Sequence, residues 1–314
     1  MQLAYINIPW MLDQKDYNCS GRTLSEWKQR GTAREVQGVA YILSMIAMIR
    51  EKLVRIPCYR LMFFNGILDV INLLAGSIIV AYFQFTGAVF CTDIVVNLFS
   101  GQLAWCSYTG SIFIRIVIGF NRCAEILPSM GRLLCLFRGK MVHMWMAICI
   151  VLMLIRPFFC RPAFYNSTAG TYLLTPFISD DREWESAHYA ILILPVTNMS
   201  VLVLLVLPYA VLCYYVYKLP SAARASIDKM ETVLLLQAVI ICSTNASAII
   251  LNNIMRLFVV PRAIVVTAHF IWQTSHGIHG VLYICVVKKI RKHVKGIFGC
   301  KSTPSAPQIP KIAF

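Results

Sequence analysis

Two charged residues of this sequence lie inside long apolar stretches, where an isolated ion is costly. Asp69 lies within Gly66–Asn72, and Arg115 lies two helical turns before Arg122 on the same expected helical face. A carboxylate surrounded by hydrocarbon needs a polar partner or a proton. We expect Asp69 and Arg115 to pair inside a helix bundle, within a polar cluster that repacks when the protein changes state. The candidate polar neighbours of Asp69 are Asn65, Asn72, Ser275 and His276.

A stripe of polar and aromatic side chains runs along the last apolar stretch. Its members are His269, Trp272, Gln273, His276 and His279. The spacing of the last two histidines suits a metal pair, but no carboxylate or cysteine stands beside them at a convincing spacing, so we expect no metal or other cofactor. No Ser/His/Asp constellation, acidic metal motif or phosphate-binding glycine loop occupies a plausible position, so we expect no enzyme.

The elements that carry these residues are apolar enough to be membrane helices. The sequence is 58% hydrophobic and 14% charged, whereas a soluble domain has roughly 45–50% and 25%. A bilayer core about 30 Å thick needs roughly 20 apolar residues in a helix. Seven stretches approach or reach that length: Val36–Ile49, Leu61–Phe83, Ile94–Phe120, Met141–Phe159, Tyr189–Tyr217, Thr232–Met255 and Ala263–Val287. We therefore predict an all-α membrane protein, a bundle of seven transmembrane helices.

Basic residues gather in alternate loops, and this predicts an N-terminus outside the cell, because cytoplasmic loops carry the excess of Lys and Arg. The net charge of +15 is spread over these loops rather than one patch interleaved with aromatic residues, so we do not expect a nucleic-acid partner. The prediction divides the chain into an extracellular segment (1–35), a membrane domain (36–287) and a cytoplasmic tail (288–314). The tail begins with a short amphipathic helix on the inner leaflet, followed by Cys300, which is either palmitoylated or a free thiol. Asn18 and Asn166 begin Asn-x-Ser/Thr sequons in outer segments and are predicted glycosylation sites.

Six short motifs together resemble the nematode serpentine receptor class T family. They are YNCSG at 17–21, CYRLMFF at 58–64, GAVFC at 87–91, NRC at 121–123, VIICSTNASA at 239–248 and WQTSHG at 272–277. The resemblance implies a seven-helix G-protein-coupled receptor that detects chemical cues in sensory neurons. It implies a multi-pass protein of the plasma membrane, with sensory cilia as one candidate location. The implied partners are a heterotrimeric G protein, an external small-molecule ligand and membrane lipids.

The resemblance also suggests roles for particular residues. Arg122 stands at the inner end of the third span, where a G-protein-coupled receptor usually has an acid–arginine pair, and we expect it to serve G-protein coupling; an ordinary arginine of the inner loop is the other interpretation. We expect the ligand among the outer halves of the third, fifth, sixth and seventh spans. The candidate contacts are Asn97, Trp105, His188, Asn198, Asn252, His269, Trp272 and Gln273.

Cys91 lies at the outer mouth of the third span, where many seven-helix receptors attach an extracellular segment through a disulfide. Cys19 and Cys160 are the candidate partners. We favour Cys19, because Cys160 directly follows the fourth span; three free thiols are the remaining alternative.

Two other classes of function stay open. A transporter or channel would use Asp69, Arg115 and the histidine stripe along a polar pathway, but the two halves of the sequence show no convincing repeat. A receptor that no longer functions is the other alternative, because Val36–Ile49 is short for a membrane span.

Overall fold

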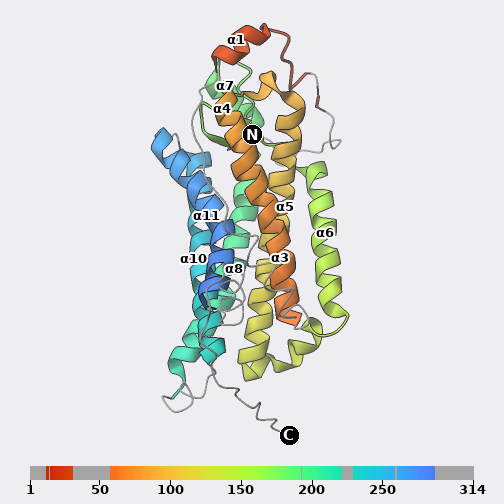
Figure 1. Ribbon diagram of the computed structural model, residues 1–314, viewed down its shortest axis with the longest axis vertical. Helices are drawn as coiled ribbons and strands as arrows, with labels where there is room; N and C mark the ends of the chain where they lie inside the picture. Colours follow the sequence, from red (N-terminus) through yellow and green to blue (C-terminus); the bar gives the residue numbers. More distant parts are fainter. Residues whose placement is uncertain are drawn as a thin grey trace, which may run out of the picture.

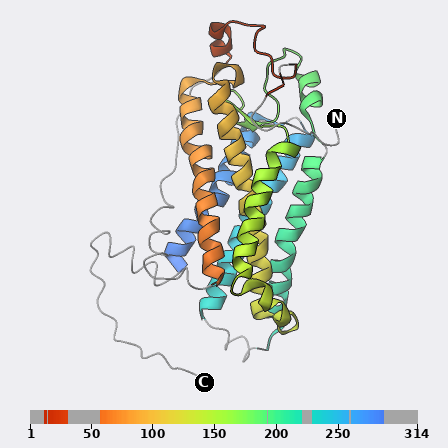
Figure 2. The same cartoon turned by 90° about the vertical axis from the view of Figure 1, so that its right-hand side faces the viewer.

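A computed structural model of the chain describes residues 12–13, 15–30, 57–191, 193–220, 229–258 and 260–286. Long helices run side by side in these parts of the chain, with short elements at one end (Figures 1 and 2). The predicted first span, the amphipathic helix of the tail and Cys300 lie outside the described residues.

Six of the seven predicted spans are helices in the structure. The second span is made of α3 (Pro57–Leu73), a π-helical turn η2 (Leu74–Ile79) and α4 (Val80–Thr86). The remaining five are α5 (Ile94–Ile126), α6 (Met141–Phe159), α8 (Ile193–Lys218), α10 (Lys229–Leu257) and α11 (Arg262–Val286). By length and composition, four helical stretches of the described residues can cross a membrane, and Val239–Met255 is a shorter apolar helix. The four are Arg60–Thr86, Ile94–Ile126, Met141–Phe159 and Leu194–Lys218.

Helix α5 is the axis of the bundle. It packs against α3, α6 and α8, while α11 closes the ring between α3 and α10. The Asp93 carboxylate accepts a hydrogen bond from the Val96 amide at 3.3 Å and caps the helix start. The helix ends where Leu127 precedes a proline, since that position disfavours helical backbone. The helix therefore runs past the predicted end at Phe120 and includes Arg122.

The π-helical turn η2 has consequences for its neighbours. Two of its carbonyl oxygens are used by other elements: Gly76 O accepts from Gln273 Nε2, and Ala75 O accepts from Tyr172 Oη at 3.1 Å. A Cβ at Gly76 would lie 2.8 Å from the Trp272 ring, so glycine is needed for this close approach. The turn thus fastens the second span to α11 and to the outer loop.

A β-hairpin covers the outer end of the bundle, which the all-helical prediction did not include. Strands β1 (Phe164–Asn166) and β2 (Thr171–Leu173) pair antiparallel, with Tyr165 opposite Tyr172. The hairpin rests directly on α5, where a Cβ at Gly101 would lie 1.7 Å from Ala163 O. The predicted start of the fifth span at Tyr189 is also wrong, because Tyr189 ends a separate outer helix, α7 (Arg182–Tyr189).

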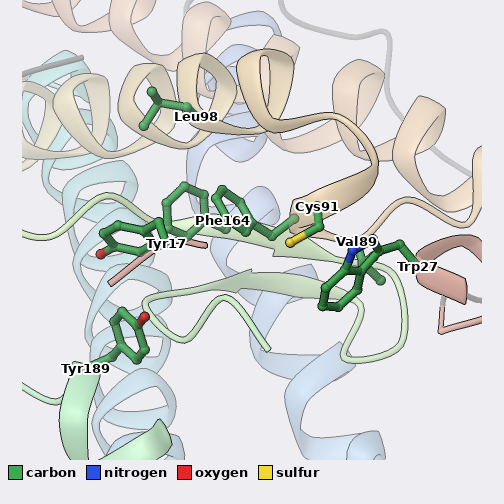
Figure 3. Packing of buried hydrophobic residues seen from close by; sticks show 8 residues of the cluster. Tyr17, Trp27, Val89, Cys91, Leu98, Phe164 and Tyr189 are labelled. Carbon is green, nitrogen blue, oxygen red and sulfur yellow. The ribbon is translucent and has the colours of Figure 1, made fainter. Parts of the chain in front are cut away.

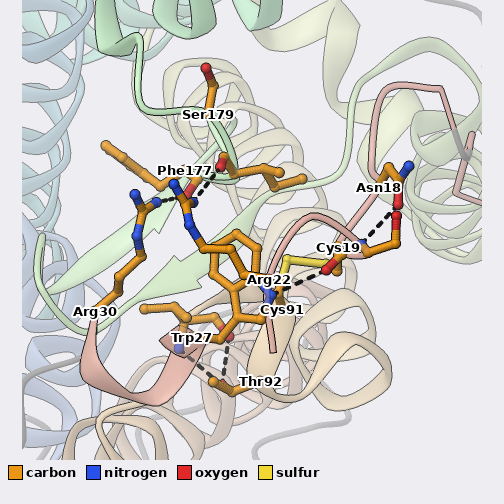
Figure 4. The surroundings of a disulfide bond; sticks show 12 residues. Asn18, Cys19, Arg22, Trp27, Arg30, Cys91, Thr92, Phe177 and Ser179 are labelled. Atoms are coloured by element: carbon orange, nitrogen blue, oxygen red, sulfur yellow. Dashed lines mark hydrogen bonds between the residues drawn. A yellow bond between two sulfur atoms is a disulfide. The ribbon is translucent and has the colours of Figure 1, made fainter. Parts of the chain in front are cut away.

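The described part of the N-terminal segment, which was predicted to be extracellular, is folded onto this outer layer. Its helix α1 (Leu24–Gln29) begins with a capping box between Thr23 and Glu26. Tyr17 and Trp27 are buried in one cluster, in which Tyr17 packs against Phe164 and Tyr189 and Trp27 lies beside Val89 (Figure 3). A disulfide joins Cys19 to Cys91 (Figure 4), which is the pairing favoured from the sequence, and Cys160 is a free cysteine.

Candidate functional site

A buried ionic cluster occupies the middle of the bundle. Arg115 Nη2 on α5 lies 2.6 Å from Asp69 Oδ1 on α3, and the two side chains are 3% and 0% exposed. The same carboxylate oxygen lies 2.6 Å from His276 Nδ1 on α11 and accepts a hydrogen bond from Ser111 Oγ at 3.2 Å. Asn65 Nδ2 donates to the other oxygen, Asp69 Oδ2, at 2.5 Å. The expected pairing of Asp69 with Arg115 is therefore present, and His276 is one of the expected neighbours that joins it.

The sixth span completes this cluster through Asn245. Arg115 Nη1 donates to Asn245 Oδ1. The Asn245 amide nitrogen donates to Ile241 O at 2.7 Å, which turns its oxygen toward the guanidinium. The cluster thus joins the second, third, sixth and seventh spans, with one positive and one negative side chain that offset each other. From the sequence, Asn245 was included only within the motif at 239–248 and was given no role, although a buried amide in an apolar span is itself a signal.

Two expected members of the cluster bond elsewhere. Asn72 Nδ2 donates to Leu68 O at 3.0 Å, and Ser275 Oγ donates to Trp272 O at 2.7 Å. Each satisfies a backbone carbonyl of its own helix instead of Asp69.

A cavity of about 70 Å³ lies between this cluster and the outer hairpin. One water needs roughly 10–15 Å³, so the cavity has room for a small molecule of several heavy atoms. It is lined by Ala104, Trp105, Tyr108, Thr171, Tyr172, Asn198, Asn252, Ala268, His269 and Trp272. Five of the eight residues predicted to contact a ligand line this cavity: Trp105, Asn198, Asn252, His269 and Trp272.

The other three predicted contacts have structural partners. Asn97 is fully buried and holds the hairpin on α5, since its amide nitrogen donates to Tyr165 O at 2.9 Å and its oxygen accepts from Tyr165 N at 2.6 Å. His188 lies in the outer layer on α7, 3.1 Å from Asp16 Oδ1. Gln273 lies behind His269, with its amide nitrogen 2.9 Å from His269 Nε2. None of the three is among the described residues that line the cavity, and a ligand contact of these residues stays a prediction.

Aromatic contacts connect the cavity to the ionic cluster. The Trp272 and Tyr108 rings line the cavity, and their centroids lie 5.6 and 6.1 Å from that of His276, both edge to face. His276 in turn bonds the Asp69 carboxylate. Only one side chain therefore separates the cavity wall from the buried ion pair.

At the inner end of α5, Arg122 forms an ion pair with Glu125 one turn further along the same helix. The distance from Nη1 to Oε2 is 2.8 Å, and Asn121 Nδ2 donates to the second oxygen, Oε1, at 3.2 Å. The side chains of residues 229–238, at the inner end of the sixth span, lie outside the described residues, and the expected role of Arg122 in G-protein coupling stays a prediction. The acid partner that the structure shows for Arg122 lies on the same helix.

Ion pairs also fix the extracellular layer. Arg161 Nη1 lies 2.8 Å from Asp16 Oδ2, and His188 approaches the other oxygen. Burial acts to raise the pKa of Asp16, but the hydrogen bonds from His188 and Arg161 outweigh it, so that this pKa falls below its usual 3.8. Asp180 binds both Arg22 and Arg30, and the hydrogen bond from Arg30 is the main reason that its pKa is also lowered.

The two predicted glycosylation sites differ in exposure. Asn18 is exposed beside the disulfide, whereas Asn166 is 6% exposed at the end of β1. The Asn166 side-chain oxygen accepts from the Thr168 and Ala169 amides and forms the hairpin turn. A glycan on Asn166 would have to break this turn.

Comparison with known proteins identifies the family. The family model for the serpentine type 7TM GPCR chemoreceptor Srt matches residues 1–306. Serpentine receptor class T-55 of Caenorhabditis elegans is 22% identical over 290 residues, which cover 88% of this chain and 78% of the relative. The match includes the first predicted span, and the described helices agree with a seven-helix bundle. The chain therefore belongs to the Srt family of serpentine seven-transmembrane chemoreceptors.

Proposed function

We propose that this chain binds an external small molecule in the cavity beneath the hairpin and, in response, activates a heterotrimeric G protein at the plasma membrane, with the sensory cilium as its site of action. The observation that carries the proposal is the contact of Trp272 and Tyr108 with both the cavity and His276. A ligand that displaces either ring must change the surroundings of the Asp69–Arg115 pair.

The ionic cluster supplies the two-state element. In the described structure, Arg115 binds Asp69 and Asn245 together and so holds the sixth span against the second and third. A ligand shifts such an equilibrium only as far as it binds one state better than the other. Movement of His276 weakens the hold on Asp69, Asn245 is released, and the inner end of the sixth span moves away from Arg122. The G protein then docks beside Arg122.

The transporter or channel alternative has less support. It needs Asp69 and Arg115 along an open pathway, but these side chains are buried against each other. Neither residue lines the cavity.

Nucleotide exchange on purified G proteins tests the proposal without a known ligand. The full chain is placed in proteoliposomes with a panel of heterotrimeric G proteins, and basal exchange is compared among wild type, Asn245→Ala and Arg122→Ala. Asn245→Ala spares the Asp69–Arg115 pair but frees the sixth span, so it should raise basal exchange. Arg122→Ala should abolish exchange, also in combination with Asn245→Ala.

A matched control separates coupling from misfolding. Asn72→Ala also removes a buried amide, but one that bonds only its own helix backbone in the described structure, and it should leave exchange near the wild-type level. If correctly inserted wild type and Asn245→Ala catalyse exchange on no G protein of the panel, the proposed coupling is wrong. Surface staining of the chain expressed in a sensory neuron tests the non-functional alternative, which predicts retention inside the cell.

A further inference from the structure

We infer that the ligand of this cavity is an uncharged molecule with both a hydrogen-bond donor and an acceptor, and that amines and carboxylates are excluded. This inference rests on the proposed function, because it describes the ligand of the same site. Three features of the cavity wall support it.

The first feature is the lack of a counter-charge. Among the described residues that line the cavity, none is acidic and none is lysine or arginine. Arg156 lies behind the wall, with its guanidinium carbon 4.3 Å from the centroid of the Trp105 ring. An ion that leaves water for this site finds no opposite charge there, and an unpaired buried ion is strongly disfavoured.

The second feature is that the hydrogen-bond network keeps His269 neutral. Gly76 O is a carbonyl and can only accept, so the amide nitrogen of Gln273 must face it. That nitrogen also lies 2.9 Å from His269 Nε2, and the two can form a hydrogen bond only when this ring nitrogen is unprotonated. The ring proton is then on Nδ1, which lies 3.4 Å from Thr171 Oγ1 at the cavity. A second proton on Nε2 would face the Gln273 amide nitrogen, which is itself a donor, so this hydrogen bond favours a neutral His269 whose N–H is on Nδ1 at the cavity.

The third feature is an acceptor on the neighbouring helix α10, which also lines the cavity. Asn252 Nδ2 donates to Ala248 O at 2.9 Å, and this fixes the orientation of its amide. Its Oδ1 is the atom left to accept a donor from the cavity. Asn198, which bonds Asn253 Oδ1 through Nδ2 at 3.2 Å, offers a second carbonyl in the same way. A ligand that matches the site accepts from His269 and donates to Asn252 or Asn198.

Aromatic rings complete the site. Trp105, Tyr108 and Trp272 also line the cavity and offer apolar surface for a compact apolar body. Small neutral amides, such as benzamide, combine such a body with one donor and one acceptor.

Binding of matched probes to the full chain in lipid nanodiscs tests this inference without a G protein. Three skeletons (benzyl, cyclohexyl and butyl) are each measured as the amide, amine, carboxylate and hydrocarbon by equilibrium binding at neutral pH. We expect the amide to bind best in at least one skeleton and its amine and carboxylate counterparts to bind at least about 100-fold more weakly. An amine or carboxylate that binds best, or the failure of every probe to bind, overturns the inference.

Two substitutions at one position locate the binding and report its chemistry. Asn252→Asp introduces the missing counter-charge and should improve amine binding at least about tenfold relative to the amide. Asn252→Leu should weaken the amide about tenfold and leave the hydrocarbon unchanged. If either variant fails to fold, Asn198→Asp and Asn198→Leu test the same points from the fifth span. An amine that gains nothing from a folded aspartate variant overturns the inference.

The proposed G-protein coupling and the proposed ligand class can be refuted independently of each other. Selective amide binding without nucleotide exchange on any G protein would refute the coupling and leave the ligand class intact. Nucleotide exchange by a chain whose cavity prefers an ion would refute only the ligand class.

Discussion

Replacing Asp69 with asparagine should destabilise the chain strongly, because it leaves the Arg115 cation without its counter-charge. Asparagine keeps the shape of the side chain, so the change removes mainly the charge. The pair is 0% and 3% exposed, so water cannot take over the lost interaction. Removing one partner of a buried ion pair costs about 3–5 kcal/mol. We expect a loss of that size in the free energy of unfolding.

Substitution of both partners distinguishes charge from packing. Arg115→Met alone leaves a carboxylate that keeps Asn65, Ser111 and His276 as partners and can also take a proton, so we expect a smaller loss of about 1–3 kcal/mol. The double variant Asp69→Asn/Arg115→Met contains no buried ion. Apolar replacement of a whole buried pair is often nearly neutral, so the double variant should be more stable than Asp69→Asn alone.

Unfolding of the full chain in mixed micelles with increasing dodecyl sulfate, followed by circular dichroism, measures these differences. Glu125→Gln is the matched control, because it breaks the ion pair with Arg122 at the inner end of α5, where the Glu125 side chain is 36% exposed. This partly exposed pair should contribute about 1 kcal/mol or less. The reasoning is refuted if Asp69→Asn costs no more than Glu125→Gln, or if the loss in the double variant equals the sum of the two single losses.

Three further predictions concern the extracellular layer. Cys19→Ser should lower the stability by about 4 kcal/mol, since the disulfide joins residues 72 positions apart; thermal unfolding with and without reductant measures this, and an unchanged midpoint would contradict the bond. Asn18→Gln should remove an electrophoretic shift that is sensitive to glycosidase, whereas Asn166→Gln should leave the electrophoretic mobility unchanged. A shift that depends on Asn166 would show that the hairpin turn opens during synthesis. The lowered pKa of Asp16 means that its carboxylate stabilises the fold above pH about 3.8, and that this contribution is lost as the pH falls through the lower folded-state pKa. Asp16→Asn should therefore reduce the stability at neutral pH and flatten its dependence below pH 4 in an acid titration, and an unchanged acid profile would argue against the Asp16–Arg161 pair.

Hydropathy alone was enough to predict the six spans that the structure describes as helices, because an apolar run of sufficient length has few alternatives in a bilayer. The same argument found Asp69 and Arg115, since each is an ion within such a run. It could not find Asn245 as the partner of Arg115, because an amide is tolerated in a membrane helix for many reasons and its orientation depends on the packing of three other helices.

The outer layer was the least predictable part of the fold. The hairpin consists of two strands of three residues each, too short for an alternating pattern to be recognised. The hydrogen bonds of Asn97 to the hairpin were not predicted, for a related reason. A polar residue near the outer end of a span can contact a ligand or a loop, and only the position of Tyr165 distinguishes the two.

The π-helical turn at Leu74–Ile79 also sets the direction in which the side chains of α4 point around the helix axis. A π turn accommodates one residue more than an α turn, and each residue of an α-helix advances the chain by about 100°. Deleting one residue between Leu74 and Ile79 would restore α-helical phase and rotate α4 by that angle, carrying Phe83 and Gln84 away from Tyr165. An alignment of this span with a relative that has an uninterrupted α-helix therefore requires a one-residue gap at this turn, and side chains compared without that gap would be assigned to the wrong face.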